Sequence, residues 1–343
     1  MKPRIAVLFG GPSVEHEVSV ISARGVLENI DREAFFPLPV YQDRQGGWHG
    51  PETALKVLDG GKSVVRQGQG LESILNKAKA QAAFPLVHGT FGEDGTLQGA
   101  LEAHRIPYVG CGVKASAVGM DKEICKQIWK HEGLPIVPYE TVRAEEPPDT
   151  WPRVKRSLAL PVFVKPSDSG SSVGITKVGQ WHELKNALEK AFKVTRKALV
   201  EKGIEGREIE VSVLGGYQPD YISPPGEVVP SREFYDYEDK YQSDQAQLKI
   251  PAQMPPGLQN KFRELAAKAF TAIDGYGMAR VDFFLEGRDR VYLNEINSIP
   301  GFTPISMYPK LLGLLGLSYA QVITRLIDLA FKRGASKLDL YLK

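Results

Sequence analysis

Three side chains near the carboxyl end of the sequence carry oxygen atoms at a spacing that suits a metal ion. The segment MARVDFFLEGRDRVYLNEINSIPG has the pattern of two β-strands joined by a short turn that contains glycine, which predicts an antiparallel pair. Asp282 lies on the first strand, and Glu295 and Asn297 share one face of the second because they are two apart. With Asp282 opposite them, the three groups would converge. Hard oxygen ligands of this kind suit Mg²⁺, which also binds phosphates and water.

Arg280 offers a second interpretation of the same segment. It lies two residues before Asp282 on the same strand face, so it could form an ion pair with Asp282 while Glu295 faces solvent. The neighbouring residues are apolar, and an unpaired carboxylate among them is costly unless a cation compensates it. A segment that binds phosphate elsewhere in the chain would favour the metal site.

The segment KPSDSGSSVGI is a candidate for that phosphate site. Lys165 ends a predicted strand and supplies a point charge, and small residues after it let backbone N–H groups approach an anion. The loop matches neither of the two common glycine-rich nucleotide patterns, and such a loop alone is more often a plain surface turn. Its position between two predicted strands favours phosphate binding. The small loop residues are Ser167, Ser169, Gly170, Ser171, Ser172 and Gly174.

The composition describes an ordinary globular protein with more than one domain. The chain has 343 residues, of which 42% are hydrophobic and 24% charged. The 43 basic and 41 acidic residues are mixed along the chain, which argues against a nucleic acid or a membrane surface as the main partner. No apolar run approaches the roughly 18 residues of a membrane span. The two cysteines form no metal or disulfide pattern, which fits a cytoplasmic location.

Strand and helix signals alternate along the amino-terminal half, which predicts α/β layers. A strand at Arg4–Phe9 is broken by glycines, and a second strand at Ala82–His88 leads into the polar loop HGTFGEDGT. Glycine-rich loops at the carboxyl ends of strands are typical of an open sheet that binds a ligand. Residues 45–72 have only weak patterning and predict a loop-rich excursion. The last helix signal covers Tyr319–Phe331, and a polar tail follows from residue 334.

Taken together, these segments resemble the ATP-grasp enzymes and, more narrowly, the D-alanine–D-alanine ligases. The resemblance covers about residues 4–330, and several of its motifs are long. They occur in the family's order: GGPSVEHEVSVISA, HGTFGEDGTLQG, MDK at 120–122, KPSDSGSSVGI, FYDYEDKY and EINSIPGFTPISMYP.

The resemblance implies an ATP-grasp fold of three domains, α/β overall and α+β in the carboxyl-terminal half. An open-sheet substrate domain would cover residues 1–121 and a central subdomain residues 122–205. The carboxyl-terminal domain, with the metal site and a mobile loop at 231–248, would cover residues 206–343. ATP would bind between the last two domains.

The resemblance also implies a reaction. The carboxylate of one D-alanine attacks the γ-phosphate of ATP, which gives an acyl phosphate and ADP. The amine of a second D-alanine then displaces phosphate and forms the dipeptide used in cell-wall peptidoglycan synthesis. The implied cofactor is Mg²⁺ or Mn²⁺, as two ions, and the implied assembly is a homodimer in the cytoplasm.

The family's nucleotide and metal residues can be carried over onto matching positions. Glu201 and Lys202 match the adenine hinge, Glu208 the ribose contact, and Lys240 a lysine on the mobile loop. Glu295 is placed to bridge two ions. The implied nucleotide-binding residues are Lys122, Lys165, Ser171, Ser172, Glu201, Lys202, Glu208, Lys240 and Phe284, and the implied metal ligands are Asp282, Glu295 and Asn297.

The substrate residues are carried over in the same way. Glu15 matches the carboxylate that holds the first substrate's ammonium, and His88 lies in the loop beside it. Ser171 and Tyr241 link Glu15 to the mobile loop. The implied donors to the tetrahedral oxyanion are Arg280 and the backbone of Gly301, and those to the second substrate's carboxylate are Ser306 and the backbone of Met307.

Two other classes of protein share part of this pattern. A different ATP-grasp ligase would keep the metal and phosphate residues, but it should lack Glu15, Tyr241 and the GFTPISM segment together. A nucleotide-binding module without catalysis would be expected to have lost a metal ligand or Arg280, and the sequence retains them.

Overall fold

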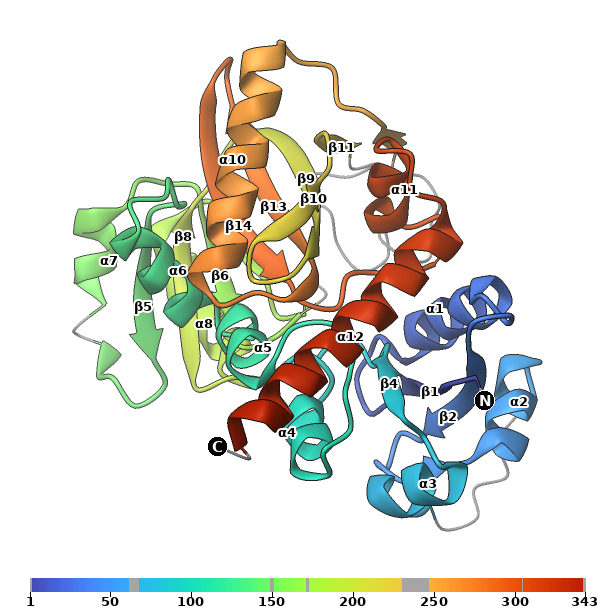
Figure 1. The fold of residues 1–343 in the computed structure, drawn as a ribbon. Helices are drawn as coiled ribbons and strands as arrows, with labels where there is room; N and C mark the ends of the chain where they lie inside the picture. Colours follow the sequence, from blue (N-terminus) through green and yellow to red (C-terminus); the bar gives the residue numbers. More distant parts are fainter. Residues whose placement is uncertain are drawn as a thin grey trace.

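The computed structural model describes residues 2–61, 68–148, 151–170, 173–229, 247–303 and 305–341. Its strands form three separate sheets with helices packed against them, as the predicted α/β class requires (Figure 1). Within the described part of the chain, no helix is long and apolar enough to cross a membrane.

The first sheet has four strands in the order β3-β2-β1-β4. β1 pairs in parallel with β2 on one side and with β4 on the other, so the order in which strands are added to the sheet reverses at β1. Such a reversal places a ligand crevice at the carboxyl ends of the central strands. Glu15 follows β1 and His88 follows β4, so both lie at this edge. The elements are β1 (Arg4–Gly10), α1 (His16–Asn29), β2 (Phe36–Gln42), β3 (Trp48–His49), α2 (Pro51–Leu58), α3 (Leu71–Ala78), β4 (Ala82–Pro85) and α4 (Thr96–Ala103).

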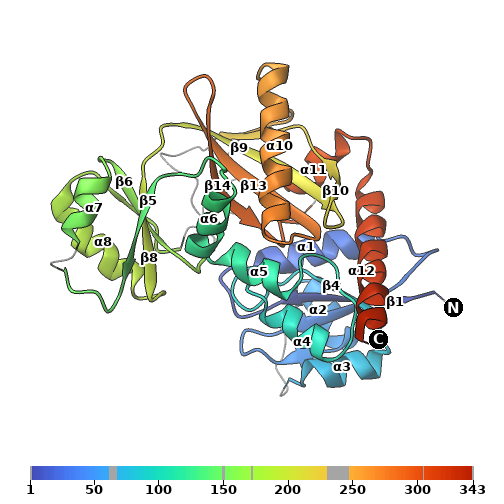
Figure 2. The same ribbon diagram turned by 60° about the vertical axis from the view of Figure 1, so that its left-hand side comes forward.

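The second sheet is antiparallel, in the order β5-β8-β6-β7, and has its own apolar core. Val162 and Val164 on β6 point into that core, so Lys165 points to the opposite face. Figure 2 shows this unit projecting to one side of the molecule. The elements are β5 (Tyr139–Arg143), α7 (Pro152–Ser157), β6 (Val162–Pro166), β7 (Thr176–Val178), the 3₁₀ helix η2 (Trp181–Glu183), α8 (Leu184–Ala191) and β8 (Lys197–Lys202).

The third sheet has six strands in the order β12-β11-β9-β13-β14, with β10 paired to β9. Its apolar face packs against three helices, α5, α6 and α10. Trp129 of α6 lies in this core, where its indole donates to the carbonyl of Ala269 at 3.0 Å. The elements are α5 (Val113–Met120), α6 (Lys122–His131), β9 (Gly206–Gly215), β10 (Pro219–Ile222), β11 (Gly226–Val229), β12 (Gln247–Lys249), α10 (Pro256–Ala272), β13 (Gly277–Glu286) and β14 (Arg290–Asn297).

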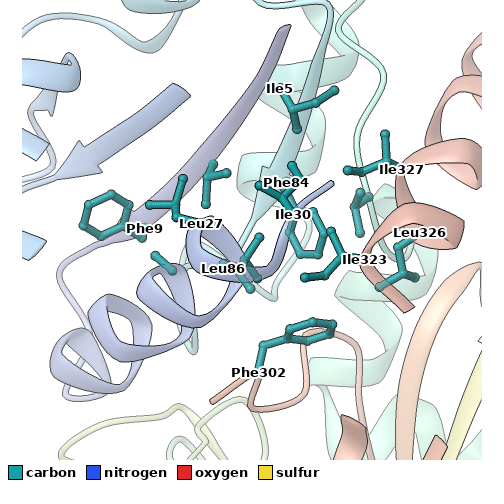
Figure 3. Close-up of a cluster of buried hydrophobic side chains, with 14 of the residues drawn as sticks. Ile5, Phe9, Leu27, Ile30, Phe84, Leu86, Phe302, Ile323, Leu326 and Ile327 are labelled. Carbon is teal, nitrogen blue, oxygen red and sulfur yellow. The ribbon is translucent and has the colours of Figure 1, made fainter. Parts of the chain in front are cut away.

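The first and last segments of the chain share one hydrophobic core. The last helices are α11 (Met307–Gly313) and α12 (Tyr319–Tyr341). Ile323, Leu326 and Ile327 of α12 pack with residues of the first sheet (Figure 3). Further along α12, Arg333 donates to the carbonyls of Tyr108 and Gly110, at 2.7 Å each. The carboxyl-terminal unit is therefore packed firmly onto the amino-terminal sheet.

The structure corrects two expectations from the sequence. Residues 45–72 contain β3, α2 and the start of α3, although positions 62–67 lie outside the described residues. Gly- and Gln-rich composition hides α2, which begins at Pro51 and buries only Ala54 and Leu58. The tail from residue 334 is also helical, because α12 continues to Tyr341. The boundaries after residues 121 and 205 remain a prediction.

The packing of α12 generates a first prediction. Leu326→Ala should lower the free energy of unfolding by about 2–5 kcal/mol, because it removes a fully buried side chain from the shared core. Urea denaturation followed by circular dichroism measures the change. Lys332→Ala, on the exposed face of the same helix, is the control and should change it by less than about 0.5 kcal/mol. Equal effects of the two substitutions would contradict the packing of α12.

Candidate active site

The predicted antiparallel pairing of the strands that carry Asp282, Glu295 and Asn297 is confirmed. In the β13–β14 register Asp282 lies opposite Glu295, and Arg280 lies opposite Asn297. On the other side of β13, Asp282 lies opposite Glu210 of β9. Alternation along β13 buries Val281 and its alternate neighbours in the core, so the polar residues share the other face. One row across three strands therefore carries three carboxylates.

The alternative ion pair is also present. Arg280 Nε and Nη2 donate to the two oxygens of Asp282, at 2.8 and 2.7 Å. The same guanidinium lies 3.1 Å from Glu210 Oε2, and the amide of Asn297 donates to Asp282 Oδ2 at 3.0 Å. Glu295 does not simply face solvent, because Lys122 Nζ lies 3.6 Å away. The charges on this face are therefore compensated by arginine and lysine.

The donor set fits a hard divalent cation. Asp282 and Glu295 supply carboxylate oxygens and Asn297 an amide oxygen, on one sheet face and in adjacent pairs. The amide orientation is a choice of assignment, so Asn297 can present its oxygen instead of its nitrogen. No group of three or more His, Cys, Asp or Glu that could hold a metal occurs in the described ranges, and this set contains only two carboxylates. Phosphate oxygens would have to complete the coordination.

Two predicted lysines reach this face from other elements. Lys122 is the first residue of α6, whose amino-terminal N–H groups are capped by the carboxylate of Asp121. Its ammonium donates to the carbonyl of Ser169 in the phosphate loop at 2.8 Å. Lys165, at the end of β6, donates to Asn294 of β14 at 3.2 Å and lies 5.8 Å above the Phe284 ring. Both ammonium groups therefore lie between the second and third sheets.

Glu201 of β8 is a buried carboxylate between two lysines. Its Oε2 lies 2.7 Å from Lys165 Nζ and its Oε1 3.1 Å from Lys126 Nζ. Burial alone would raise the pKa of Glu201, but the two ammonium groups outweigh it and hold the pKa below its ordinary value. Lys202, the next residue, lies 3.5 Å from Glu286 of β13. Glu208 of β9 is the strand partner of Phe284.

The predicted first-substrate residue, Glu15, lies where three loops meet. A Cβ at Gly89 would come within 3.0 Å of Glu15 Oε2, and one at Gly170 within 3.5 Å. Gly89 belongs to the loop after β4, and Gly170 belongs to the phosphate loop. The Glu15 carboxylate is nearly buried, at 8% exposure. It is therefore adjacent to both the predicted phosphate loop and the loop after β4.

His88 and Glu93 hold the backbone of Ile299, which lies between Asn297 and Gly301. His88 Nδ1 lies 3.0 Å from the Ile299 carbonyl, and the Ile299 N–H donates to Glu93 Oε1 at 3.1 Å. Glu93 Oε2 also accepts from the Gly89 N–H at 2.7 Å. Burial lowers the pKa of His88, so the imidazole is neutral and its Nδ1–H donates to the carbonyl. The loop after β4 thus fixes the backbone just after Asn297, the last residue of β14.

The predicted second-substrate residues lie at the start of α11. Ser306 Oγ lies 3.0 Å from the Thr303 backbone nitrogen, which donates to it, and 2.7 Å from Thr303 Oγ1. A Cβ at Gly301 would come within 3.0 Å of Ser306 Oγ, so a side chain there would force the Ser306 hydroxyl to shift. Met307 is buried against Val228 and Leu311. The Gly301 backbone and the Ser306 hydroxyl are thus neighbours.

Four predicted site residues lie outside the described part of the chain. They are Ser171, Ser172, Lys240 and Tyr241.

Glu93, Lys126 and Glu210 contact the predicted site residues but were not predicted from the sequence. A feature of the sequence could have indicated each of them. Glu210 is two after Glu208 on an alternating strand, and Lys126 is four after Lys122 on a helix. Glu93 is an acid within a loop that the motifs already marked.

Comparisons with protein families match most of the chain. The family model described as "D-ala D-ala ligase N-terminus" matches residues 4–111, and "D-ala D-ala ligase C-terminus" matches residues 128–328. A D-alanine–D-alanine ligase of Solibacter usitatus is 46% identical over 98% of this chain and 98% of its own length. One of Prosthecochloris aestuarii is 44% identical over 97% of this chain and 99% of its own length.

Solved structures agree with these matches. The D-alanine–D-alanine ligase of Coxiella burnetii has a TM-score of 0.85 at 33% identity, over 99% of this chain and 97% of that one. The VanG D-Ala:D-Ser ligase of Enterococcus faecalis also has a TM-score of 0.85, at 32% identity over 96% of this chain and all of its own. The fold is therefore the ATP-grasp fold.

The surroundings of Glu93 generate a prediction on pH. Burial and the carboxylate of Glu15 raise the pKa of Glu93 from 4.5 to about 8. Between these values the folded protein keeps a proton that the unfolded chain releases, so this group's contribution to stability is lost as pH rises toward 8. Glu93→Gln has no proton to release, and its melting temperature should fall less steeply between pH 5 and 8 than that of the unchanged protein.

Differential scanning fluorimetry across this range measures the slope. Glu145→Gln, at an exposed position, is the matched control and should keep the unchanged protein's slope. Parallel curves for Glu93→Gln and the unchanged protein would contradict the assignment.

Proposed function

The chain belongs to the D-alanine–D-alanine ligase family, and from that premise we propose that it joins two D-alanines with ATP through an acyl phosphate, releasing ADP and phosphate. One observation carries most of this proposal. Lys122 Nζ lies 2.8 Å from the Ser169 carbonyl of the phosphate loop and 3.6 Å from Glu295 of the metal face. A nucleotide phosphate held at that loop would therefore meet the metal ligands and a lysine at one place.

The nucleotide would bind between the second and third sheets. Lys122 and Lys165 would neutralise its phosphates, and the glycine and serine loop would donate backbone N–H groups. The backbone at Glu201 and Lys202 would form the adenine hinge, since the Glu201 carboxylate is held by two lysines, and Glu208 would meet the ribose. Phe284 offers an apolar surface beside Lys165, 5.8 Å from its ammonium. Ser171, Ser172 and Lys240 complete the proposed set.

Asp282, Glu295 and Asn297 would hold two divalent ions, Mg²⁺ or Mn²⁺. Bound there, the metal would supply Lewis-acid neutralisation of charge on the transferred phosphoryl group. Arg280 donates to both Asp282 oxygens, each of which has a second lone pair that could bind the metal. A metal there would weaken the pair with Arg280, and the guanidinium could then also donate to the reacting substrate.

The first step is phosphoryl transfer to a carboxylate. Glu15 would bind the ammonium of the first D-alanine, and Ser171 and Tyr241 would connect Glu15 to the mobile loop. A carboxylate oxygen of the substrate attacks the γ-phosphorus, and the bond from phosphorus to the β–γ bridging oxygen breaks. Positioning and charge neutralisation are the main contributions a protein makes to such a transfer. His88 would not bind a charged group of the substrate, because its imidazole is hydrogen-bonded to the Ile299 carbonyl.

The second step forms the peptide bond. Ser306 and the Met307 N–H would bind the second D-alanine's carboxylate, so that its neutral amine faces the acyl carbon. The amine attacks that carbon, Arg280 and the Gly301 N–H donate to the resulting oxyanion, and the phosphate leaves with its bonding electron pair. The attacking nitrogen gives up one proton, to the departing phosphate or to solvent, and keeps the other as the amide N–H. A side chain at Gly301 would press on the Ser306 hydroxyl, which is the proposed donor to the second substrate.

We place the dipeptide in peptidoglycan precursor synthesis in the cytoplasm, by an enzyme that is a homodimer. These three statements rest on the family resemblance. Sedimentation at several concentrations tests the dimer.

An assay of ADP release tests the proposed function. With Mg²⁺–ATP, D-alanine should stimulate ADP release, because it carries both the ammonium for Glu15 and the attacking carboxylate. L-alanine and D-lactate offered separately should not, since one has the opposite configuration and the other has no ammonium. D-serine added with D-alanine tests the second substrate named for VanG. If D-alanine leaves ADP release at background, the proposal fails.

Two variants of one hairpin tie the activity to this site. Asp282→Asn removes a proposed metal ligand and should lower kcat by at least about 100-fold. Asp289→Asn, on the exposed turn of the same hairpin, should leave kcat unchanged within about twofold. Equal activities of the two variants would place the chemistry elsewhere.

A further inference from the structure

Lys126 is a buried lysine that the proposed mechanism does not use. Its side chain has 0% exposure, and it lies one turn after Lys122 on α6. The adjacent residue Cys125 and the later Trp129 pack in the apolar core of the third sheet. A buried ammonium is costly, and an apolar side chain of similar length is often as stable at such a position. Its presence therefore calls for a role beyond packing.

The contacts of Lys126 point to Glu201. Its ammonium lies 3.1 Å from Glu201 Oε1, while Lys165 binds Oε2 at 2.7 Å. Within the described part of the chain, neither Lys126 Nζ nor Glu201 Oε1 has a well-directed hydrogen bond, so the pair is held by charge. Lys126 touches Glu201 from the buried side. Lys165 is 12% exposed and lies on the side of Asn294 and Phe284.

The charge count decides how firmly Glu201 holds Lys165. Two ammonium groups and one carboxylate leave a net charge of plus one. Lys126 therefore neutralises part of the negative charge that would otherwise attract Lys165. Without Lys126 the carboxylate has a single cation, and charge attraction in a buried site is strong. Glu201 would then attract Lys165 more strongly, and Lys165 would bind a phosphate less tightly.

We propose that Lys126 is a positioning residue for the nucleotide: it neutralises Glu201 from the buried side and so leaves the Lys165 ammonium available to the phosphates. This rests on the proposed nucleotide site. Lys126 touches no substrate, and its effect passes through Glu201 and Lys165. The consequence is specific, because the loss should fall on ligands that carry phosphate.

The test measures binding without D-alanine, by calorimetry with the Mg²⁺-bound β,γ-imido analogue of ATP. Lys126→Met should raise the Kd of the analogue about tenfold and that of adenosine, measured by competition, less than threefold. Lys126→Arg keeps the charge and should stay within threefold for both ligands. Lys130→Met, exposed on the same helix, is the matched control and should stay within twofold.

The outcomes separate this inference from the proposed function. If the unchanged protein does not bind the analogue, the nucleotide site itself fails. If it binds and Lys126→Met binds equally well, or loses both ligands to the same extent, the positioning role is wrong. Should Lys126→Met not fold, Lys126→Gln is used, because it can donate to Glu201 without the charge. An unchanged Kd there also overturns the proposal.

Discussion

The strand register of β9, β13 and β14 is the constraint on which the rest of the structure depends. It places Glu210, Asp282 and Glu295 in one row, and alternation sends the residues between them into the core. A slip of one residue would exchange the two faces and bury the charges. Carboxylates this close repel one another, so cations must surround them. Arg280 and Lys122 provide those cations.

Ion pairs and hydrogen bonds also connect the second and third sheets. Lysines from α6 and β6 meet carboxylates and amides of β8 and β14, so the nucleotide region is built from pieces of two sheets. The amino-terminal unit is connected differently, through the core shared with α12 and through the hold of His88 and Glu93 on Ile299. That hold lies between Asn297 and Gly301. A change in the loop after β4 can therefore reach both Asn297, a proposed metal ligand, and Gly301, the proposed oxyanion donor.

The sequence predicts well whatever depends on local spacing. The β13–β14 hairpin, the two-residue separation of Glu295 from Asn297 and the strand that ends at Lys165 follow from alternation alone. Contacts between distant segments cannot be predicted in this way, because no local period reports that Glu201 lies between Lys126 and Lys165. Helix α2 was missed since it buries only two side chains, and the end of α12 because Gly334 interrupts the apolar pattern. Residue spacing does not predict the reaction. The proposed reaction comes from the order of the motifs, which resembles that of a known family.

The central claim is that the carboxylate of one D-alanine takes the γ-phosphate before the peptide bond forms. D-alanine labelled with ¹⁸O in both carboxylate oxygens tests it directly, with Mg²⁺–ATP and mass spectrometry of the released phosphate. The account predicts one labelled oxygen in the phosphate for each dipeptide formed, because the oxygen that attacks phosphorus leaves with it. Unlabelled phosphate, with all the label kept in the dipeptide or in water, would contradict it.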